Sequence, residues 1–112
     1  LMHSLQDFTG TEYAMCDVLP GKAAMKEKLQ MVGYVEAELM GDTVLGKAGT
    51  KLRGHEFHFS EDAVEGKRPL RFEKLRTGAS RGNVLGSYLH LHFAGCPEAA
   101  AHFVEACTSW AR

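Results

Sequence analysis

Four of the six histidines lie in two short segments, and histidine is the side chain best suited to proton transfer near neutral pH. The first segment is Arg53-Gly-His-Glu-Phe-His-Phe-Ser60, and the second is Ser87-Tyr-Leu-His-Leu-His-Phe93. If both segments are extended, Glu56 and His58 share one face of the first strand. His90 and His92 likewise share one face of the second strand. These residue types indicate either acid–base catalysis or metal binding.

A metal site is the first interpretation of the four side chains. Two imidazoles on one strand, with an imidazole and a carboxylate on a neighbouring strand, are suitable ligands for a transition metal. The pattern of cupin barrels also requires a glutamate a few residues after the His-x-His pair. Here the next carboxylate is Glu98, which lies beyond Pro97. A non-catalytic module with a histidine-lined metal site therefore stays an alternative, and no residue is assigned as a metal ligand.

Activation of a cysteine is the second interpretation. A neutral imidazole at a strand end can accept the proton of a thiol and so generate a nucleophilic thiolate. The three cysteines do not suit this role. Cys16 and Cys107 lie in apolar patterns that favour packing in the core, and Cys96 lies at a predicted helix start. His55, on the phenylalanine-bearing face of its strand, is interpreted as a core residue.

Composition limits the class of protein. A chain of 112 residues with 45% hydrophobic and 24% charged residues is one globular domain or a piece of one. The net charge of −1 provides no electrostatic footprint for nucleic acid or an anionic membrane. No apolar run is long enough to span a bilayer, and the first residues do not resemble a signal peptide. An odd number of dispersed cysteines favours a reduced, cytoplasmic setting.

The elements expected to position these residues are mostly strands. Strands are predicted over residues 12–19, 32–39, 51–60, 70–75 and 83–93, with a charged loop over 62–69. A short helix is predicted over 22–30. A longer helix is predicted from Pro97, because an apolar stripe recurs there at helical spacing. The stripe comprises Ala100, Phe103, Val104, Cys107 and Trp110. The sequence thus predicts a mixed α/β fold with a C-terminal helix.

Five segments, in order, resemble the C-terminal part of the cobyrinate a,c-diamide synthase family. They are Val18-Leu-Pro-Gly21, Leu29-Gln30, Gly33-Tyr-Val-Glu-Ala37, Arg53–Ser60 and Gly82–Phe93. The stretch from Pro97 to Cys107 also resembles the closing helix of that family. The resemblance covers nearly the whole chain and is loosest over residues 62–80. It implies an α/β, flavodoxin-like fold with a mixed sheet, in which residues 1–112 form the C-terminal portion of a class I glutamine amidotransferase domain.

The resemblance implies an activity. The family amidates the a and c carboxylates of cobyrinate, a corrin precursor of cobalamin, and uses ATP, magnesium and glutamine. An N-terminal domain binds ATP and magnesium, and the amidotransferase domain hydrolyses glutamine with a cysteine that a histidine activates. His90 matches this catalytic histidine. Glu56, His58 and His92 are expected to line the same pocket. The implied partners are glutamine and the corrin precursor, without nucleic acid or membrane.

Two departures from the family pattern concern the catalytic residues. Many class I amidotransferases have a glutamate two residues after the catalytic histidine, but this position is His92 here. The third catalytic residue is then absent or comes from elsewhere, with Glu56 as a candidate. The family cysteine lies in a Cys-Gly-Gly motif followed closely by Leu-Met, and this chain begins with Leu1-Met2. We therefore expect the nucleophile elbow and the ATP-binding domain to be absent, and the isolated chain to be inactive.

Other functions stay open at this stage. The same family includes amidases of a nickel tetrapyrrole, and the chain does not separate that substrate from a cobalt corrin. A degenerate amidotransferase domain with a docking role is a further alternative. Half of a doubly wound domain exposes a sheet edge and part of a face, so we expect the isolated chain to self-associate.

Overall fold

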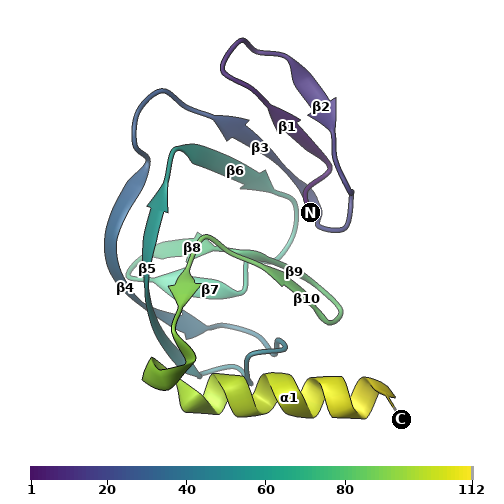
Figure 1. Cartoon of the computed structure of the whole chain (residues 1–112), viewed down its shortest axis with the longest axis vertical. Coiled ribbons are helices and arrows are strands. Elements are labelled where there is room, and N and C mark those ends of the chain that lie inside the picture. The colour runs from purple at the N-terminus through teal and green to yellow at the C-terminus, as the bar shows by residue number, and fades with distance from the viewer. Residues whose placement is uncertain (112) are drawn as a thin grey trace.

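The structure, a computed structural model, describes residues 1–111 and consists of three β-sheets followed by a C-terminal helix (Figure 1). The helix is α1 (Pro97–Ala111), and the 3₁₀ helix η1 (Phe93–Gly95) precedes it. The strands are β1 (Ser4–Gln6), β2 (Glu12–Ala14), β3 (Gly21–Met25), β4 (Met31–Leu39), β5 (Lys51–His58), β6 (Ser60–Val64), β7 (Leu70–Phe72), β8 (Leu75–Thr77), β9 (Ala79–Arg81), β10 (Val84–Gly86) and β11 (His90–Leu91).

The sheets have the strand orders β2-β1-β3-β6, β11-β5-β4-β7-β8 and β10-β9. The β1–β3 pair is parallel, and the other pairs are antiparallel. The first sheet is therefore mixed. The predicted α/β class, with a mixed sheet and a C-terminal helix, is confirmed.

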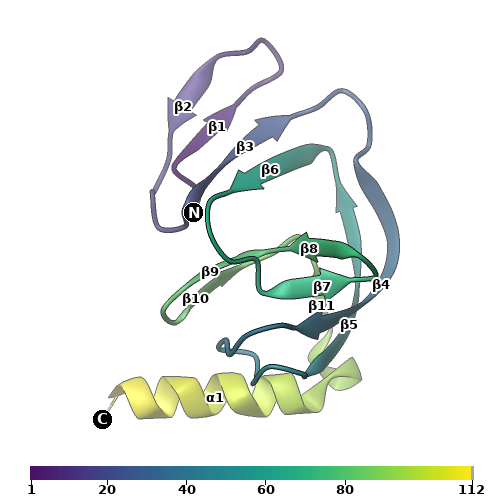
Figure 2. The same cartoon turned by 180° about the vertical axis from the view of Figure 1, so that it is seen from behind.

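One long bent hairpin connects the two larger sheets (Figure 2). The register of β4 with β5 runs from Met31↔His58 to Glu38↔Lys51, and β3 pairs with β6 beyond a bend. At the bend, the Lys26 N–H donates to the Phe59 carbonyl at 3.1 Å, and the Gln30 N–H donates to the His58 carbonyl at 2.9 Å. These bonds satisfy backbone groups where the strands change sheets. The bend brings the end of β5 and the start of β6 to one pocket.

The core lies beside the five-stranded sheet. Its buried members are apolar side chains from the sheet and from the start of α1: Val35, Ala37, Leu39, Leu52, Leu70, Cys96 and Ala99. The predicted common face of Val35, Ala37 and Leu39 is confirmed. The remaining apolar stripe of α1 is largely uncovered, because Phe103 is 44% exposed and Trp110 is 81% exposed. The helix also contacts the loop between β4 and β5, where the Nδ1 atom of His102 lies 3.2 Å from the Val44 carbonyl oxygen.

The predicted helix over residues 22–30 is wrong. Residues Gly21–Met25 form β3, and each pairs with a residue of β6. A Cβ on Gly21 would lie 2.5 Å from the Ala63 carbonyl oxygen, which shows how closely the two backbones approach. Tertiary pairing with β6 overrides the local helical pattern.

Two predicted strands are shorter than expected, and each predicted span contains a residue with a left-handed backbone conformation. The strand predicted over 12–19 ends at Ala14, and Asp17 has a φ of 55°. The strand predicted over 70–75 is divided into β7 and β8 by a turn in which Glu73 has a φ of 54°. An extended strand does not include such residues. The predicted charged loop also begins later than expected, since β6 continues to Val64.

The single strand predicted over 83–93 is also wrong, because it is divided into β10 and β11. Between them, the Ser87 hydroxyl accepts the backbone N–H of Leu89 at 3.0 Å. This local bond replaces a sheet bond, as serine side chains often do at turns. The break determines where Tyr88 lies relative to His90.

No helix among residues 1–111 has the length and apolar character needed to cross a membrane.

Candidate functional site

The two faces of β5 carry different functional groups. Along the strand, exposed residues alternate with more buried ones, as a period of two requires. We call the side bearing Arg53, His55 and Phe57 the outer face, and the side bearing Leu52, Glu56 and His58 the inner face. The interpretation of His55 as a core residue is wrong, since this residue is exposed. Candidate residues predicted to share one pocket are thus divided between two.

The outer face presents two adjacent imidazoles. His90 in β11 is directly opposite His55 in β5, and their ring centroids are 4.7 Å apart with an interplanar angle of 51°. Both residues are exposed. They line a shallow depression of about 370 Å³, which we call the outer pocket. Its lining comprises Tyr34, Val35, Glu36, Arg53, Gly54, His55, His90, His92 and Gly95.

Gly54 is responsible for the close approach of β11 to β5. A Cβ at this position would overlap the carbonyl oxygen of His90 and would lie 3.0 Å from Cδ1 of Leu89. Gly54 pairs with Leu91 in the ladder. Any larger residue would therefore displace β11, and with it the backbone that carries the His90 imidazole.

His92 shares the outer pocket with His90 but has a structural task. Its Nδ1 atom accepts the backbone N–H of Ala94 at 3.2 Å and thereby caps η1. A hydrogen bond at Nδ1 as acceptor corresponds to the tautomer protonated at Nε2. In this arrangement, His92 offers a donor to the outer pocket rather than a base.

The cysteines do not complete a thiol–imidazole pair in the described part of the chain. Cys16 and Cys107 are exposed, so the prediction that they pack in the core is wrong. Cys96 is buried at the start of α1, and its Sγ atom is 3.6 Å from the carbonyl oxygen of His92. None of the three lines the outer pocket.

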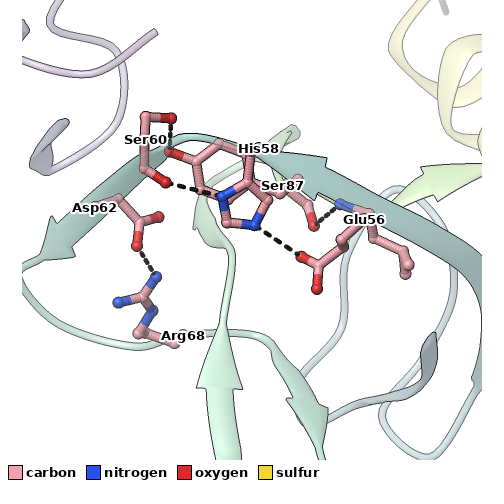
Figure 3. Close-up of polar contacts among 8 residues, drawn as sticks. Glu56, His58, Ser60, Asp62, Arg68 and Ser87 are labelled. Atoms are coloured by element: carbon pink, nitrogen blue, oxygen red, sulfur yellow. Dashed lines mark hydrogen bonds and ion pairs between the residues drawn. The ribbon is translucent and has the colours of Figure 1, made fainter. Parts of the chain in front are cut away.

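The inner face holds a chain of polar contacts around His58 (Figure 3). The Nδ1 atom of His58 lies 2.8 Å from the Ser60 carbonyl oxygen, and Nε2 lies 3.9 Å from a carboxylate oxygen of Glu56. The ring stacks on Tyr88, with centroids 3.7 Å apart and 10° between the planes. The Tyr88 hydroxyl is 2.6 Å from the Ser60 hydroxyl. Burial raises the pKa of Tyr88, so its neutral form is favoured.

Glu56, His58 and Tyr88 line a cavity of about 200 Å³, which we call the inner pocket. Its charged residues include Arg68, whose Nη2 atom is 2.5 Å from a carboxylate oxygen of Asp62. The Nε atom of Arg68 is buried and has no hydrogen-bond partner within residues 1–111. The lining comprises Gln30, Met31, Glu56, His58, Glu61, Asp62, Arg68, Phe72, Leu75, Thr77 and Tyr88.

The structure thus brings His90 and His92 together and places Glu56 and His58 in the other pocket. Sequence reasoning did not anticipate the neighbours that orient these groups, which are His55 beside His90 and Tyr88 beside His58. The two-residue spacing of Tyr88 and His90 predicts that they share one face of a strand, and this prediction is wrong. The strand is broken at Ser87, and the two side chains line different pockets.

Among residues 1–111, no group of three or more histidine, cysteine, aspartate or glutamate side chains is arranged to hold a metal ion. The four candidate ligands of the metal-module alternative are divided between the two pockets.

Comparisons with known proteins identify relatives of the chain. The cobyrinate a,c-diamide synthase of Dehalococcoides mccartyi (strain CBDB1) is 39% identical over 115 residues, which covers 94% of this chain and 25% of the relative. The enzyme of the same name from Caldanaerobacter subterraneus subsp. tengcongensis is 36% identical and covers 100% of this chain and 26% of the relative. That from Methanothermobacter thermautotrophicus is 41% identical over 84% of this chain and 23% of the relative.

The chain therefore spans about a quarter of the length of the curated relatives it matches. Residues 1–97 match the family described as the CobB/CobQ-like glutamine amidotransferase domain. This match covers both histidine-bearing segments and the outer and inner pockets. The chain belongs to the CobB/CobQ-like glutamine amidotransferase domain family.

Proposed function

We propose that this chain is the C-terminal portion of the glutaminase domain of a cobyrinate a,c-diamide synthase. The names of the relatives support this proposal, as does the fraction of their length that the chain covers. The parent enzyme would transfer ammonia from glutamine to the a and c carboxylates of cobyrinate. ATP and magnesium would activate these carboxylates in a separate N-terminal domain. We assign no residue of this chain to ATP or magnesium.

In this proposal, His90 is the general base of glutamine hydrolysis. The imidazole removes the proton from a cysteine thiol, and the thiolate attacks the side-chain amide carbon of glutamine. His90 then gives the proton to the departing nitrogen, which leaves as ammonia and a γ-glutamyl thioester remains. Water hydrolyses the thioester to glutamate and regenerates the thiol.

The single observation that carries this role is the exposure of His90 in the outer pocket. A base must reach the proton that it removes, and an exposed imidazole remains accessible to a thiol from another segment. The cysteines of this chain do not line that pocket. We therefore propose that residues of the parent enzyme outside this chain supply the nucleophile elbow.

Of the residues predicted to line the glutaminase site, His92 shares the outer pocket with His90, and we retain it there. Glu56 and His58 face the inner pocket, and we propose a different role for them below.

Glutamine hydrolysis by the isolated chain is the first test. The purified 112-residue chain should release no glutamate from glutamine above the buffer rate, because it lacks a thiol beside His90. Glutamate release that requires His90 but not an added protein would contradict the proposal.

A chimera provides the decisive test. The corresponding quarter of the Dehalococcoides mccartyi enzyme is replaced by this chain, and both glutamine-dependent and ammonia-dependent amidation of cobyrinate are measured. We expect His90→Ala to lower the glutamine-dependent rate by roughly 10²–10⁴-fold, the usual contribution of a general base. The ammonia-dependent rate should be unchanged, which shows that the chimera is folded. His3→Ala, a change at an exposed histidine, is the control. Equal rates for His90→Ala and the unsubstituted chimera would disprove the assignment.

We also propose a cytoplasmic setting and self-association of the isolated chain. Free, exposed Cys16 and Cys107 support the reducing compartment. The exposed apolar residues of α1, such as Trp110, support self-association. Light scattering tests the latter, and a strictly monomeric chain would contradict it.

A further inference from the structure

We propose that the inner pocket binds a small primary ammonium group, between the carboxylate of Glu56 and the Nε2 atom of His58. The candidate ligands are ammonium itself or the ammonium end of a short amine. This site lies on the opposite face of β5 from His90 and takes no part in the chemistry proposed for the thiol. Its existence does not depend on that proposed function.

Glu56 is a largely buried acceptor that lines the inner pocket. Its side chain is 9% exposed, and the contact that Figure 3 draws to its carboxylate is the 3.9 Å approach of the His58 ring. The 3.9 Å separation from His58 exceeds a hydrogen-bond distance. A buried carboxylate without a donor is destabilising, and such groups in folded proteins usually have a partner. The Glu56 carboxylate can therefore accept a hydrogen bond from a ligand in the inner pocket.

His58 contributes a second acceptor. Its Nδ1 atom lies 2.8 Å from the Ser60 carbonyl oxygen, which can only accept, so Nδ1 carries a proton. In the neutral ring, Nε2 then carries a lone pair, and it faces Glu56. Stacking on Tyr88 fixes the plane of the ring. A nitrogen atom placed about 2.8 Å from both the Glu56 oxygen and the His58 Nε2 atom would lie between them. Its two hydrogen bonds would then form an angle of roughly 90°, and an ammonium group has enough N–H donors to make both.

The charge balance favours a cation over a neutral donor. Asp62 is paired with Arg68, and Glu61 is paired with Lys26 at 2.9 Å. Glu56 is the carboxylate of the inner pocket that no lysine or arginine of the described chain neutralises. A single positive charge would balance it. An alkali cation satisfies the charge but not the geometry, because it needs several oxygen ligands and the pocket offers an imidazole nitrogen instead.

The size of the inner pocket limits the ligand. A volume of about 200 Å³ with apolar walls from Met31, Phe72 and Leu75 admits ammonium or a short alkylammonium. One source of the bound ammonium would be the glutaminase reaction, and this source rests on the proposed function. The α-ammonium group of glutamine is the other source with the same chemistry.

The test is an NMR titration of the 112-residue chain, with the ring signals of His58 assigned from the spectrum of His58→Gln. The probes are ammonium, ethylammonium, glutamine, potassium and tetramethylammonium, each as chloride or at matched ionic strength. We expect saturable shifts of the His58 signals with ammonium or ethylammonium and none with potassium or tetramethylammonium. Saturation by glutamine instead would assign the source to the amino acid. Equal shifts with all cations would overturn the proposal.

Two variants make the titration specific. Glu56→Gln keeps the shape of the side chain but removes its charge, and we expect at least about tenfold weaker binding, as for the loss of a charge-assisted hydrogen bond. Glu105→Gln makes the same change at an exposed position of α1 and should bind normally. Undiminished binding by Glu56→Gln would overturn the proposal. If Glu56→Gln is unfolded, the selectivity of the unsubstituted chain for ammonium over tetramethylammonium decides the question. Because no readout uses catalysis, an inactive chimera would leave this result unaffected.

Discussion

The inner and outer faces of β5 differ in what fixes their side chains. On the inner face, His58 is held by Ser60 and Tyr88, and the whole Glu56 residue, backbone included, is 7% exposed. On the outer face, His55 and His90 are exposed, and their relative position follows from the backbone register. The inner groups are therefore organised by this chain alone. The outer imidazoles are available to groups that the chain does not itself provide.

The comparison also shows how one strand serves two purposes. Successive side chains of a strand point to opposite faces, so adjacent residues such as His55 and Glu56 meet different surroundings. Substitutions that separate the two faces test this division. We consider them from the largest expected effect to the smallest.

Removal of a core side chain from the inner face should have the largest effect. Leu52 is 1% exposed, and we expect Leu52→Ala to lower the free energy of unfolding by about 2–5 kcal/mol, through lost burial and a new cavity. Tyr34, on the outer face of β4, is 93% exposed, so Tyr34→Ala should lower it by less than about 1 kcal/mol. Urea denaturation followed by circular dichroism measures both. Similar losses for the two variants would show that the outer face is covered in solution.

The position of Leu52 illustrates what the sequence could predict. Alternation of apolar and polar residues in β4 and β5 was sufficient to identify both strands and the inward face of β4. The same reasoning failed for residues 22–30, where local helical spacing competed with pairing to a strand more than thirty residues away. Nonlocal pairing of this kind leaves little trace in a short window.

Backbone packing at Gly54 should have the next largest effect. A Cβ there would overlap the carbonyl oxygen of His90, so we expect Gly54→Ala to lower the free energy of unfolding by roughly 1–3 kcal/mol. It should also weaken the NOE between the rings of His55 and His90. Gly41→Ala is the control, because a Cβ on Gly41 meets nothing within 4 Å. If the NOE were intact in Gly54→Ala, something other than the register of β11 with β5 would hold the His90 ring beside His55.

The candidate site was predictable in part. The histidine pattern identified His90 and His92, which do share a pocket. The resemblance also grouped Glu56 and His58 with them, but these two side chains lie on the opposite face of β5 from His55, the residue that pairs with His90. The predicted strand over residues 83–93 is interrupted where the Leu89 N–H donates to the Ser87 hydroxyl, next to Tyr88. A turn of this kind depends on one side-chain rotamer, which the strand pattern does not reveal.

The hydroxyl of Tyr88 should contribute a smaller amount to the inner face. Tyr88→Phe removes the 2.6 Å contact with the Ser60 hydroxyl but keeps the aromatic ring that stacks on His58. We expect a loss of about 0.5–1.5 kcal/mol in the free energy of unfolding, the usual net value of one hydrogen bond. Urea denaturation at neutral pH provides the measurement. No loss would indicate that water replaces the hydroxyl, and that the inner face is less organised than the contacts suggest.

The same side chain predicts a dependence on alkaline pH. Burial raises the pKa of Tyr88, so the folded chain holds the phenolic proton more tightly than the unfolded chain does. This contribution to stability is complete below the ordinary tyrosine pKa of about 10 and is lost as the pH rises through the folded-state pKa. The unsubstituted chain should therefore lose stability above pH ~10 more steeply than Tyr88→Phe. Tyr13, whose pKa is raised by its hydrogen bond with Asp7, contributes equally to both chains and cancels in this comparison.

The smallest effect should come from the ion pair of the outer face. Glu36 and Arg53 meet at 2.8 Å, but their side chains are 73% and 76% exposed. Exposed pairs contribute little because water screens the charges and two long side chains must be ordered. We expect Glu36→Gln to change the free energy of unfolding by less than about 0.5 kcal/mol, and less again in high salt. Asp62→Asn, which breaks the more buried pair with Arg68, should cost more and respond less to salt. If the two substitutions had equal effects, solvent would reach both faces alike, and the inner pocket would not exclude water from Glu56.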